Sequence, residues 1–117
     1  MLKIYHNPRC SKSRQTLDLI KEAAQEVEVI EYLKNPPTAA DLKDVLNKLG
    51  IPAEQLLRKG EPLYKDNHKG KSRSDDEWVQ IMVENPVLIE RPIVMTETKA
   101  ILGRPPENVM SLLKPRT

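Results

Sequence analysis

The chain of 117 residues has little cysteine: its only one is Cys10. One cysteine cannot close an internal disulfide, and such a chain fits a reducing compartment, so we expect a cytoplasmic protein. A zinc site needs about four ligands. Cys10, His6 and His68 are the only cysteine and histidine residues, which do not supply a zinc site, so we expect no metal centre.

Aromatic residues are also scarce, with three tyrosines, one tryptophan and no phenylalanine. This argues against a stacking platform for single-stranded nucleic acid. The net charge is only +2, because 19 basic and 17 acidic residues are interspersed, which gives no signature of a nucleic-acid partner. No apolar run approaches the roughly 18 residues of a membrane span. We therefore expect one globular domain over residues 1–117, monomeric, without a nucleic-acid or membrane partner.

The first third of the chain has the pattern of a βαβ unit. The alternating stretch Leu2–His6 predicts a strand, and the apolar spacing from Ser11 to Ala24 predicts a helix. A second alternating stretch, Val27–Leu33, predicts another strand. Two strands joined by a crossover helix are expected to run parallel.

The middle of the chain is predicted to be helical, over about residues 38–85. Thr38 is expected to cap a helix that stops at Gly50, and 52–57 is expected to be a short helix. The run Ser74–Glu77 has the form of a capping box. Between these helices, the polar stretch Lys65–Ser74 suggests a mobile loop with His68 solvated on the surface.

The last third predicts two strands, at Pro92–Thr96 and Ala100–Gly103, in an antiparallel hairpin, then a helix over Pro105–Leu113. The fold class is therefore α/β, with a mixed sheet of three or four strands. A βαβ half and a ββα half also make up thioredoxin-like domains. The helical stretch 38–85 would then be an insertion between the two halves.

The strongest chemical signal is Cys10, which falls between a strand and a helix. The backbone N–H groups of Ser11, Lys12 and Ser13 have no intrahelical partner there, and they favour a negative charge. Arg9, Lys12 and Arg14 add positive charge. These features lower a thiol pKa and also suit an oxyanion. The alternative, a small buried hydrophobic residue, is weaker because the neighbours are polar or basic.

The sequence has no phosphate loop of the G-x-x-x-x-G-K-[ST] type and no C-x-x-C pair. Ser13 stands where the second cysteine of such a pair would be. If Cys10 performs redox chemistry, the second thiol must come from another molecule.

Five segments, "HNPRCSKSRQTL", "EYLKNPPT", "LLRKGEP", "NPVLIERPIVMT" and "GRPPENV", together resemble the glutaredoxin-linked arsenate reductase family. They span His6 to about Val109. The resemblance implies a thioredoxin-like fold with a helical insertion. It also implies that the Cys10 thiolate attacks arsenate, that glutathione then attacks the adduct, and that glutaredoxin completes reduction to arsenite. Glutathione would be a co-substrate, and no cofactor would be bound.

The resemblance also implies roles for residues around the cysteine. His6, Ser13 and Arg14 would tune the thiol, with Ser11 and Lys12 at the oxyanion. Three arginines would support that oxyanion: Arg58, Arg91 and Arg104. A guanidinium donates paired hydrogen bonds to such an anion. Arg91-Pro92 further resembles the cis-proline site of thioredoxin-like folds.

Other interpretations stay open at this point. The protein would alternatively be a glutathione-dependent reductase of another substrate, or a non-enzymatic RNA-polymerase-binding regulator of the same fold. Such regulators often carry C-x-x-C as a redox switch, so Ser13 argues against that class. Arg58 would alternatively be a helix-end cation, and Arg104 would pair with Glu107.

Overall fold

The computed structural model describes residues 2–23 and 25–113, and the chain divides into two compact units. The first unit combines the segment up to Asn35 with the segment from Arg91 onward. The second unit is Pro36–Glu90. Among the described residues, no helix is long and apolar enough to cross a membrane.

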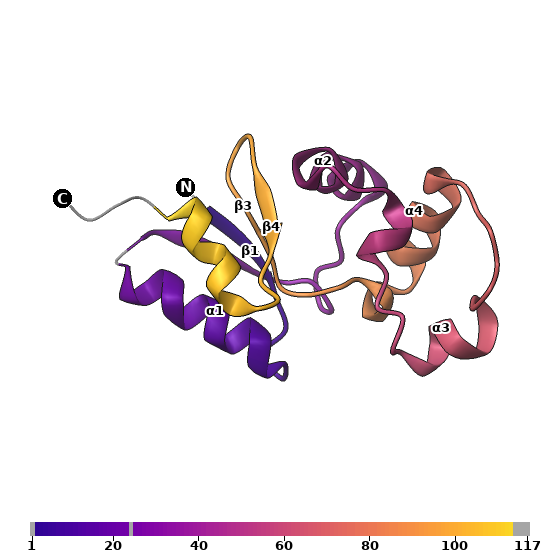
Figure 1. Ribbon diagram of the computed structural model, residues 1–117, viewed down its shortest axis with the longest axis horizontal. Coiled ribbons are helices and arrows are strands. Elements are labelled where there is room, and N and C mark those ends of the chain that lie inside the picture. The colour runs from indigo at the N-terminus through magenta and orange to yellow at the C-terminus, as the bar shows by residue number, and fades with distance from the viewer. Residues whose placement is uncertain (1, 24, 114–117) are drawn as a thin grey trace. The chain divides into compact units, whose positions relative to one another are not determined.

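The first unit contains a mixed four-stranded sheet (Figure 1). Its strands are β1 (Leu2–His6), β2 (Val27–Glu31), β3 (Ile93–Met95) and β4 (Ala100–Leu102), in the order β2-β1-β3-β4. The β1 and β2 strands are parallel, whereas β1–β3 and β3–β4 are antiparallel. The predicted α/β class, the βαβ unit and the hairpin are therefore confirmed.

One face of this sheet is covered by α1 (Ser11–Glu22) and η3 (Pro106–Leu112), which lie side by side in Figure 1. Alternation along β1 turns every second residue toward α1. The buried residues of this core are Leu2, Ile4, Leu17, Ile20, Val94 and Val109. Burying each such side chain contributes about 1.5–3 kcal/mol, so this layer anchors β1 and α1, the two elements that flank Cys10.

The second unit is helical throughout the elements that the structure describes. These are α2 (Ala39–Leu49), η1 (Ala53–Leu56), α3 (Pro62–Asn67), α4 (Asp75–Glu84) and η2 (Pro86–Leu88). Its fully buried side chains include Leu42, Val45, Leu56, Trp78, Met82 and Leu88. The predicted helical insertion between the two halves of the sheet is thus confirmed as part of the fold.

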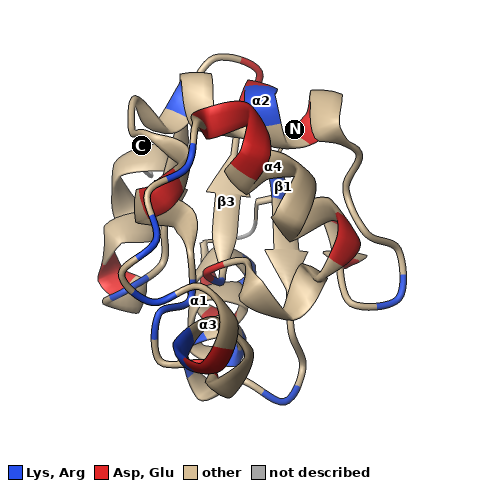
Figure 2. Ribbon diagram, turned by 90° about the vertical axis from the view of Figure 1, so that its right-hand side faces the viewer, with Lys and Arg blue, Asp and Glu red and all other residues tan. Residues whose placement is uncertain are grey.

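Local capping chemistry explains where the longer insert helices begin and end. Thr38 and Asp41 form a reciprocal capping box at the start of α2, and Ser74 and Glu77 form another at the start of α4. Gly50 closes α2 with φ of 69°, a left-handed conformation that glycine adopts without strain. Figure 2 shows acidic residues at the start of α4, where they complement the helix dipole.

Several predicted boundaries in the first unit were wrong, and β3 and β4 are both shorter than the predicted strands Pro92–Thr96 and Ala100–Gly103. Strand β2 stops at Glu31 rather than Leu33, because Lys34 and Asn35 both donate backbone hydrogen bonds to the Glu31 carbonyl and turn the chain. The first helix ends at Glu22, and the predicted end at Ala24 lies outside the described residues.

A further correction is the final helix, which is a 3-10 helix over Pro106–Leu112 rather than a helix over Pro105–Leu113. Two prolines at its start remove backbone donors. The Asn108 side chain donates to the carbonyls of Leu102 and Arg104, and the Ser111 hydroxyl donates to the Asn108 carbonyl. Such local side-chain bonds compete with α-helical geometry.

The prediction of a loop over Lys65–Ser74 with a solvated His68 was also wrong in part. Helix α3 extends to Asn67, with Pro62 in its first turn. The His68 ring is half-buried, 5.8 Å from the Trp78 ring in an edge-on contact, and the Arg73 guanidinium lies 5.5 Å from the same ring centre. Aromatic and cation–π packing orders this polar stretch, which a composition argument cannot detect.

Candidate functional site

Cys10 occupies the N-cap position of α1, directly after a tight turn. Its backbone N–H donates to the Asn7 carbonyl at 3.0 Å, and its carbonyl accepts from the Arg14 N–H at 3.0 Å. The residue is buried, with 9% of its surface exposed. The sequence predicted this junction correctly: Pro8 helps to end the strand, and the helix starts at Ser11.

The pKa of the Cys10 thiol lies below its ordinary value. Burial is the largest single influence, and it raises the pKa because a charged sulfur loses solvation. The backbone N–H of Ser13, the charge of Arg91, the N–H of Lys12 and a hydrogen bond from Arg91 all lower it. The Cys10 side chain makes no capping hydrogen bond to α1, but the N–H groups and Arg91 together outweigh the effect of burial on the pKa. The site therefore favours the nucleophilic thiolate.

A short hydrogen-bond network connects the turn before Cys10 to helix α1. The buried Ser13 hydroxyl lies 2.6 Å from His6 Nδ1 and accepts from the Asn7 N–H at 3.0 Å. Ser13 thus serves two purposes, because its own N–H favours the Cys10 thiolate. Serine at this position ties the turn to the end of β1.

Burial lowers the pKa of His6 and is the first cause of the shift. The carboxylate of Glu31 opposes this by raising the pKa, while Lys21 and Arg14 lower it further. A neutral imidazole is therefore favoured. The Ser13 hydroxyl, which already accepts from Asn7, can then donate its proton to Nδ1 of the neutral ring.

Sheet register brings Arg91 to the cysteine. Strand β3 runs antiparallel to β1 with Ile93 opposite Tyr5, so the residues just before Ile93 lie beyond the carboxyl end of β1. The turn carrying Cys10 begins at that same end. The Arg91-Pro92 bond is cis, as the resemblance suggested, and Arg104-Pro105 is cis as well.

Arg104 lies at the same edge, because Leu102 of β4 pairs with Ile93 of β3. Its Nη1 donates to the Arg91 carbonyl at 3.4 Å, and its side chain is exposed. Arg91 and Arg104 are thus brought together in the first unit. The structure assigns Arg91 a direct effect on Cys10 and gives Arg104 a contact with Arg91.

Arg58 belongs to the second unit. Its guanidinium pairs with Glu61 at 3.4 Å, and its backbone N–H donates to the Leu88 carbonyl at 2.8 Å. These contacts fit the interpretation of a local cation that stabilises the turn before α3. A role at the oxyanion stays a prediction for this residue.

The other predicted residues have distinct local positions. Arg14 is exposed, and its Nη1 donates to the Pro8 carbonyl at 2.8 Å, so it braces the turn from outside. Lys12 and Ser11 are exposed in the first turn of α1, where the N–H of Lys12 lowers the Cys10 pKa.

Sequence reasoning missed Asn7 and Glu31. Asn7 accepts the Arg9 N–H on its side-chain oxygen at 3.0 Å and the Cys10 N–H on its carbonyl, so it organises the whole turn. An asparagine before proline is a known turn-forming signal, which would have identified it. Glu31 stands opposite His6 in the β1–β2 register, and only strand pairing reveals that neighbour.

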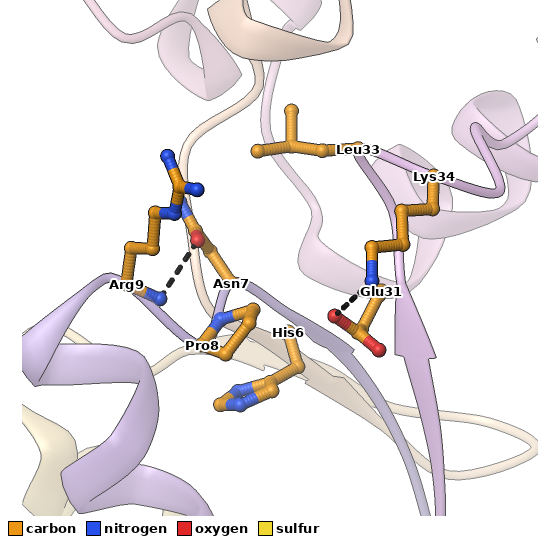
Figure 3. A pocket seen from close by; sticks show the side chains of 7 residues that line it. All are labelled: His6, Asn7, Pro8, Arg9, Glu31, Leu33 and Lys34. Carbon is orange, nitrogen blue, oxygen red and sulfur yellow. Dashed lines mark hydrogen bonds and ion pairs between the residues drawn. The ribbon is translucent and has the colours of Figure 1, made fainter.

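Glu31 also lines a pocket of about 190 Å³ in the first unit (Figure 3). Its walls come from the ends of β1 and β2 and from the residues that follow each strand. The lining residues are His6, Asn7, Pro8, Arg9, Glu31, Leu33 and Lys34.

Comparison with known proteins gives this arrangement a family. The ArsC family model matches residues 5–112, which include the Cys10 turn, the insert and the Arg91 and Arg104 segments. The chain belongs to the ArsC family. The thioredoxin-like fold that the sequence resemblance implied is confirmed by this membership.

Several ArsC relatives match over nearly their whole length. The chain is 52% identical over 114 residues to an Escherichia coli protein called uncharacterized protein YfgD, covering 96% of each. It is 43% identical to an arsenate reductase of Neisseria meningitidis, covering 96% of this chain and 97% of the relative. A solved arsenate reductase from Vibrio cholerae is 44% identical with a TM-score of 0.92, covering 96% of this chain and 97% of that one.

Proposed function

We propose that the protein is an arsenate reductase in which Cys10 is the nucleophile. The observation that carries this proposal is a lowered Cys10 pKa at a helix N-cap beside Arg91, in a chain whose relatives include named arsenate reductases. A thiolate next to a guanidinium and free backbone N–H groups suits attack on an oxyanion.

The first step forms a bond between Cys10 Sγ and arsenic. One arsenic–oxygen bond breaks, and the oxygen leaves as water after it takes protons. The thiolate of one glutathione then bonds to Cys10 Sγ, the Sγ–arsenic bond breaks, and its electron pair stays on arsenic, which leaves as arsenite. A second glutathione thiol, acting through glutaredoxin, bonds to the sulfur of the first glutathione and releases the Cys10 thiolate. In sum, arsenate and two glutathione thiols give arsenite, glutathione disulfide and water. The chain supplies one thiol, so both reducing electrons come from thiols of other molecules.

The remaining site residues support this chemistry. Arg91 and Arg104 donate hydrogen bonds to the arsenate oxygens and offset the charge that builds up as sulfur attacks. We propose Arg58 as a third such group, with Lys12 and Ser11 at the start of α1. His6, Ser13 and Arg14 position the turn, so their effect on the reaction passes through Cys10. The cytoplasm is a reducing compartment, which would keep the Cys10 thiol reduced and able to react.

The decisive experiment is a coupled assay with arsenate, glutathione, glutaredoxin, glutathione reductase and NADPH. We expect arsenate-dependent NADPH oxidation with the parent protein and a fall to background with Cys10→Ser. For Arg91→Gln we expect kcat/KM for arsenate to fall about 100-fold, the typical cost of one oxyanion donor. The exposed Lys99→Gln variant removes the same charge at the hairpin turn and should keep parental activity. Parental activity in Cys10→Ser would overturn the proposal.

A second candidate is a glutathione-dependent reductase of another substrate. It needs only the lowered pKa of the Cys10 thiol and a resolving thiol from another molecule, because Cys10 is the only cysteine of the chain. In that case the parent would show no arsenate activity, yet Cys10 would still titrate below an ordinary thiol and exchange with glutathione. The arsenate assay, the titration of Cys10 and its exchange with glutathione, measured on the same protein, distinguish the two candidates.

A further inference from the structure

A pocket lies at the carboxyl ends of β1 and β2, and apart from His6 and Asn7, which position the Cys10 turn, its lining residues have no part in the chemistry described above. It lies wholly within the first unit and has a volume of about 190 Å³. In Figure 3, the Arg9 side chain stands on one side, Glu31 and Lys34 stand on the other, and Pro8 and His6 lie between them. Arg9 directly precedes Cys10, so this pocket adjoins the reactive turn through the backbone.

The charges around the pocket favour an anionic group. The Lys34 ammonium lies 3.7 Å from the Glu31 carboxylate. The Arg9 guanidinium has no ion pair within the described part of the chain. With His6 held neutral by burial, two cations face one carboxylate. The excess positive charge can accept a carboxylate from a ligand.

The pocket also offers apolar surface. Pro8 forms part of its wall, and Leu33 keeps 45% of its surface exposed, which is unusual for a large hydrophobic residue in this chain. Small ligand sites combine apolar walls with a few placed polar groups. A short aliphatic or peptide ligand that ends in a carboxylate matches both properties.

The neighbouring cysteine indicates which ligand of this type is needed. Cys10 is the only thiol of the chain, so an adduct on its sulfur can be resolved only by a thiol from outside. We propose that this pocket is the subsite for the carboxylate end of the small peptide thiol that resolves adducts on Cys10. Arg9 and Lys34 hold that carboxylate, and Pro8 and Leu33 pack against the aliphatic part. This inference rests on the external-thiol step of the proposed function.

Thiol exchange tests the subsite without arsenate. Cys10 is first converted to a mixed disulfide with thionitrobenzoate. The thiolate of glutathione then bonds to Cys10 Sγ, the old S–S bond breaks, and the coloured thionitrobenzoate thiolate leaves with the electron pair. The rate is measured against concentration for glutathione and for its diethyl ester, in which both carboxylates are masked.

The variant is Arg9→Gln with Lys34→Gln, and the matched control is Lys3→Gln with Lys99→Gln, which removes the same two charges elsewhere in the first unit. For the parent we expect the rate to saturate with glutathione and not with the ester. The rate constant for glutathione divided by that for the ester should fall about fivefold in the Arg9/Lys34 variant. This is the scale of two exposed ion pairs. The control should keep the parental ratio.

The ratio cancels any change in Cys10 reactivity, because both thiols attack the same sulfur. An unchanged ratio in the Arg9/Lys34 variant, or an equal fall in the control, would overturn the subsite. The first result would mean that no carboxylate is held there, and the second would mean general attraction by net charge. Failure of arsenate reduction would leave this ratio unaffected, so the two proposals fail separately.

Discussion

At the scale of single residues, the reactivity of Cys10 depends on a balance of opposing effects. Burial favours the neutral thiol, whereas the N–H of Ser13, the N–H of Lys12 and the guanidinium of Arg91 favour the thiolate. Because the favourable groups come from two distant parts of the chain, either part can be altered separately.

Replacing Arg91 tests its share of this balance. Arg91→Gln removes a positive charge and a charged donor, so the pKa of Cys10 should rise toward that of an ordinary thiol. The rate of alkylation by iodoacetamide, followed against pH, should therefore reach its midpoint at a higher pH than in the parent. Lys99→Gln should leave the midpoint in place. A midpoint that stays unchanged in Arg91→Gln would show that the backbone N–H groups alone set the pKa.

Ser13 is the second residue with a clear structural cost. Ser13→Ala leaves the His6 ring and the Asn7 N–H without the hydroxyl that contacts both, in a buried site. An unsatisfied buried group costs about 1–3 kcal/mol, and we expect the free energy of unfolding in urea to fall by that amount. Ser72→Ala, at an exposed position, should change it by less than about 0.5 kcal/mol. Equal stability of the two variants would contradict the network.

At the scale of elements, the close approach of β4, α1 and β3 depends on Gly103. Its N–H donates to the Pro92 carbonyl at 2.9 Å, and its carbonyl lies 3.4 Å from the Thr16 hydroxyl. A Cβ at this position would stand 2.5 Å from Thr16 Oγ1 and 2.7 Å from Pro92 Cγ. Only glycine allows the end of β4 to pass between the helix and the proline beside Arg91.

Gly103→Ala should therefore force these elements apart. We expect a loss of about 1–3 kcal/mol in the free energy of unfolding, the usual cost of overpacking. A Cβ at Gly60 meets nothing within 4 Å, so Gly60→Ala is the matched control and should be neutral or slightly stabilising. Chemical denaturation of both variants measures the difference. Parental stability of Gly103→Ala would show that β4, α1 and Pro92 leave room for a Cβ at this position.

At the scale of the whole molecule, charge is spread along the chain with both signs interspersed (Figure 2), and the pKa of each of the two histidines lies below its ordinary value. Burial is the first cause that lowers the pKa of each, with Arg73 and Lys71 adding to the shift at His68. Glu77 also has a lowered pKa, caused first by the Ser74 N–H, and it titrates in a more acidic range.

These shifts predict how stability depends on pH. A histidine whose pKa is lowered by folding binds protons more readily in the unfolded chain, so stability rises with pH in that window. The free energy of unfolding should be highest above the ordinary value of 6.5 and should fall as pH drops through the lower folded values. Urea denaturation across this range measures the slope. The double variant His6→Asn with His68→Asn should flatten it, and an unchanged slope would assign the effect to carboxylates.

Local patterns were enough for most elements and for part of the site. Capping boxes at Thr38 and Ser74, the glycine at Gly50 and the alternation in β1 all depend on neighbours in sequence, and each prediction was confirmed. Some errors came from local hydrogen bonds, as at the end of β2, and others came from packing between residues distant in sequence. The ordered stretch around His68 is the clearest case, because its partner Trp78 lies on another helix.

The sequence by itself determined that one thiol sits at the start of a helix, among basic residues and free backbone N–H groups. It determined this because strand, turn and helix signals act over a few residues. Only the tertiary structure decided that Arg91 acts on Cys10, that Glu31 faces His6, and that a pocket opens beside the turn. Those neighbours depend on the register of β1 against β2 and β3, which is fixed by burial of the whole sheet and not by any one segment.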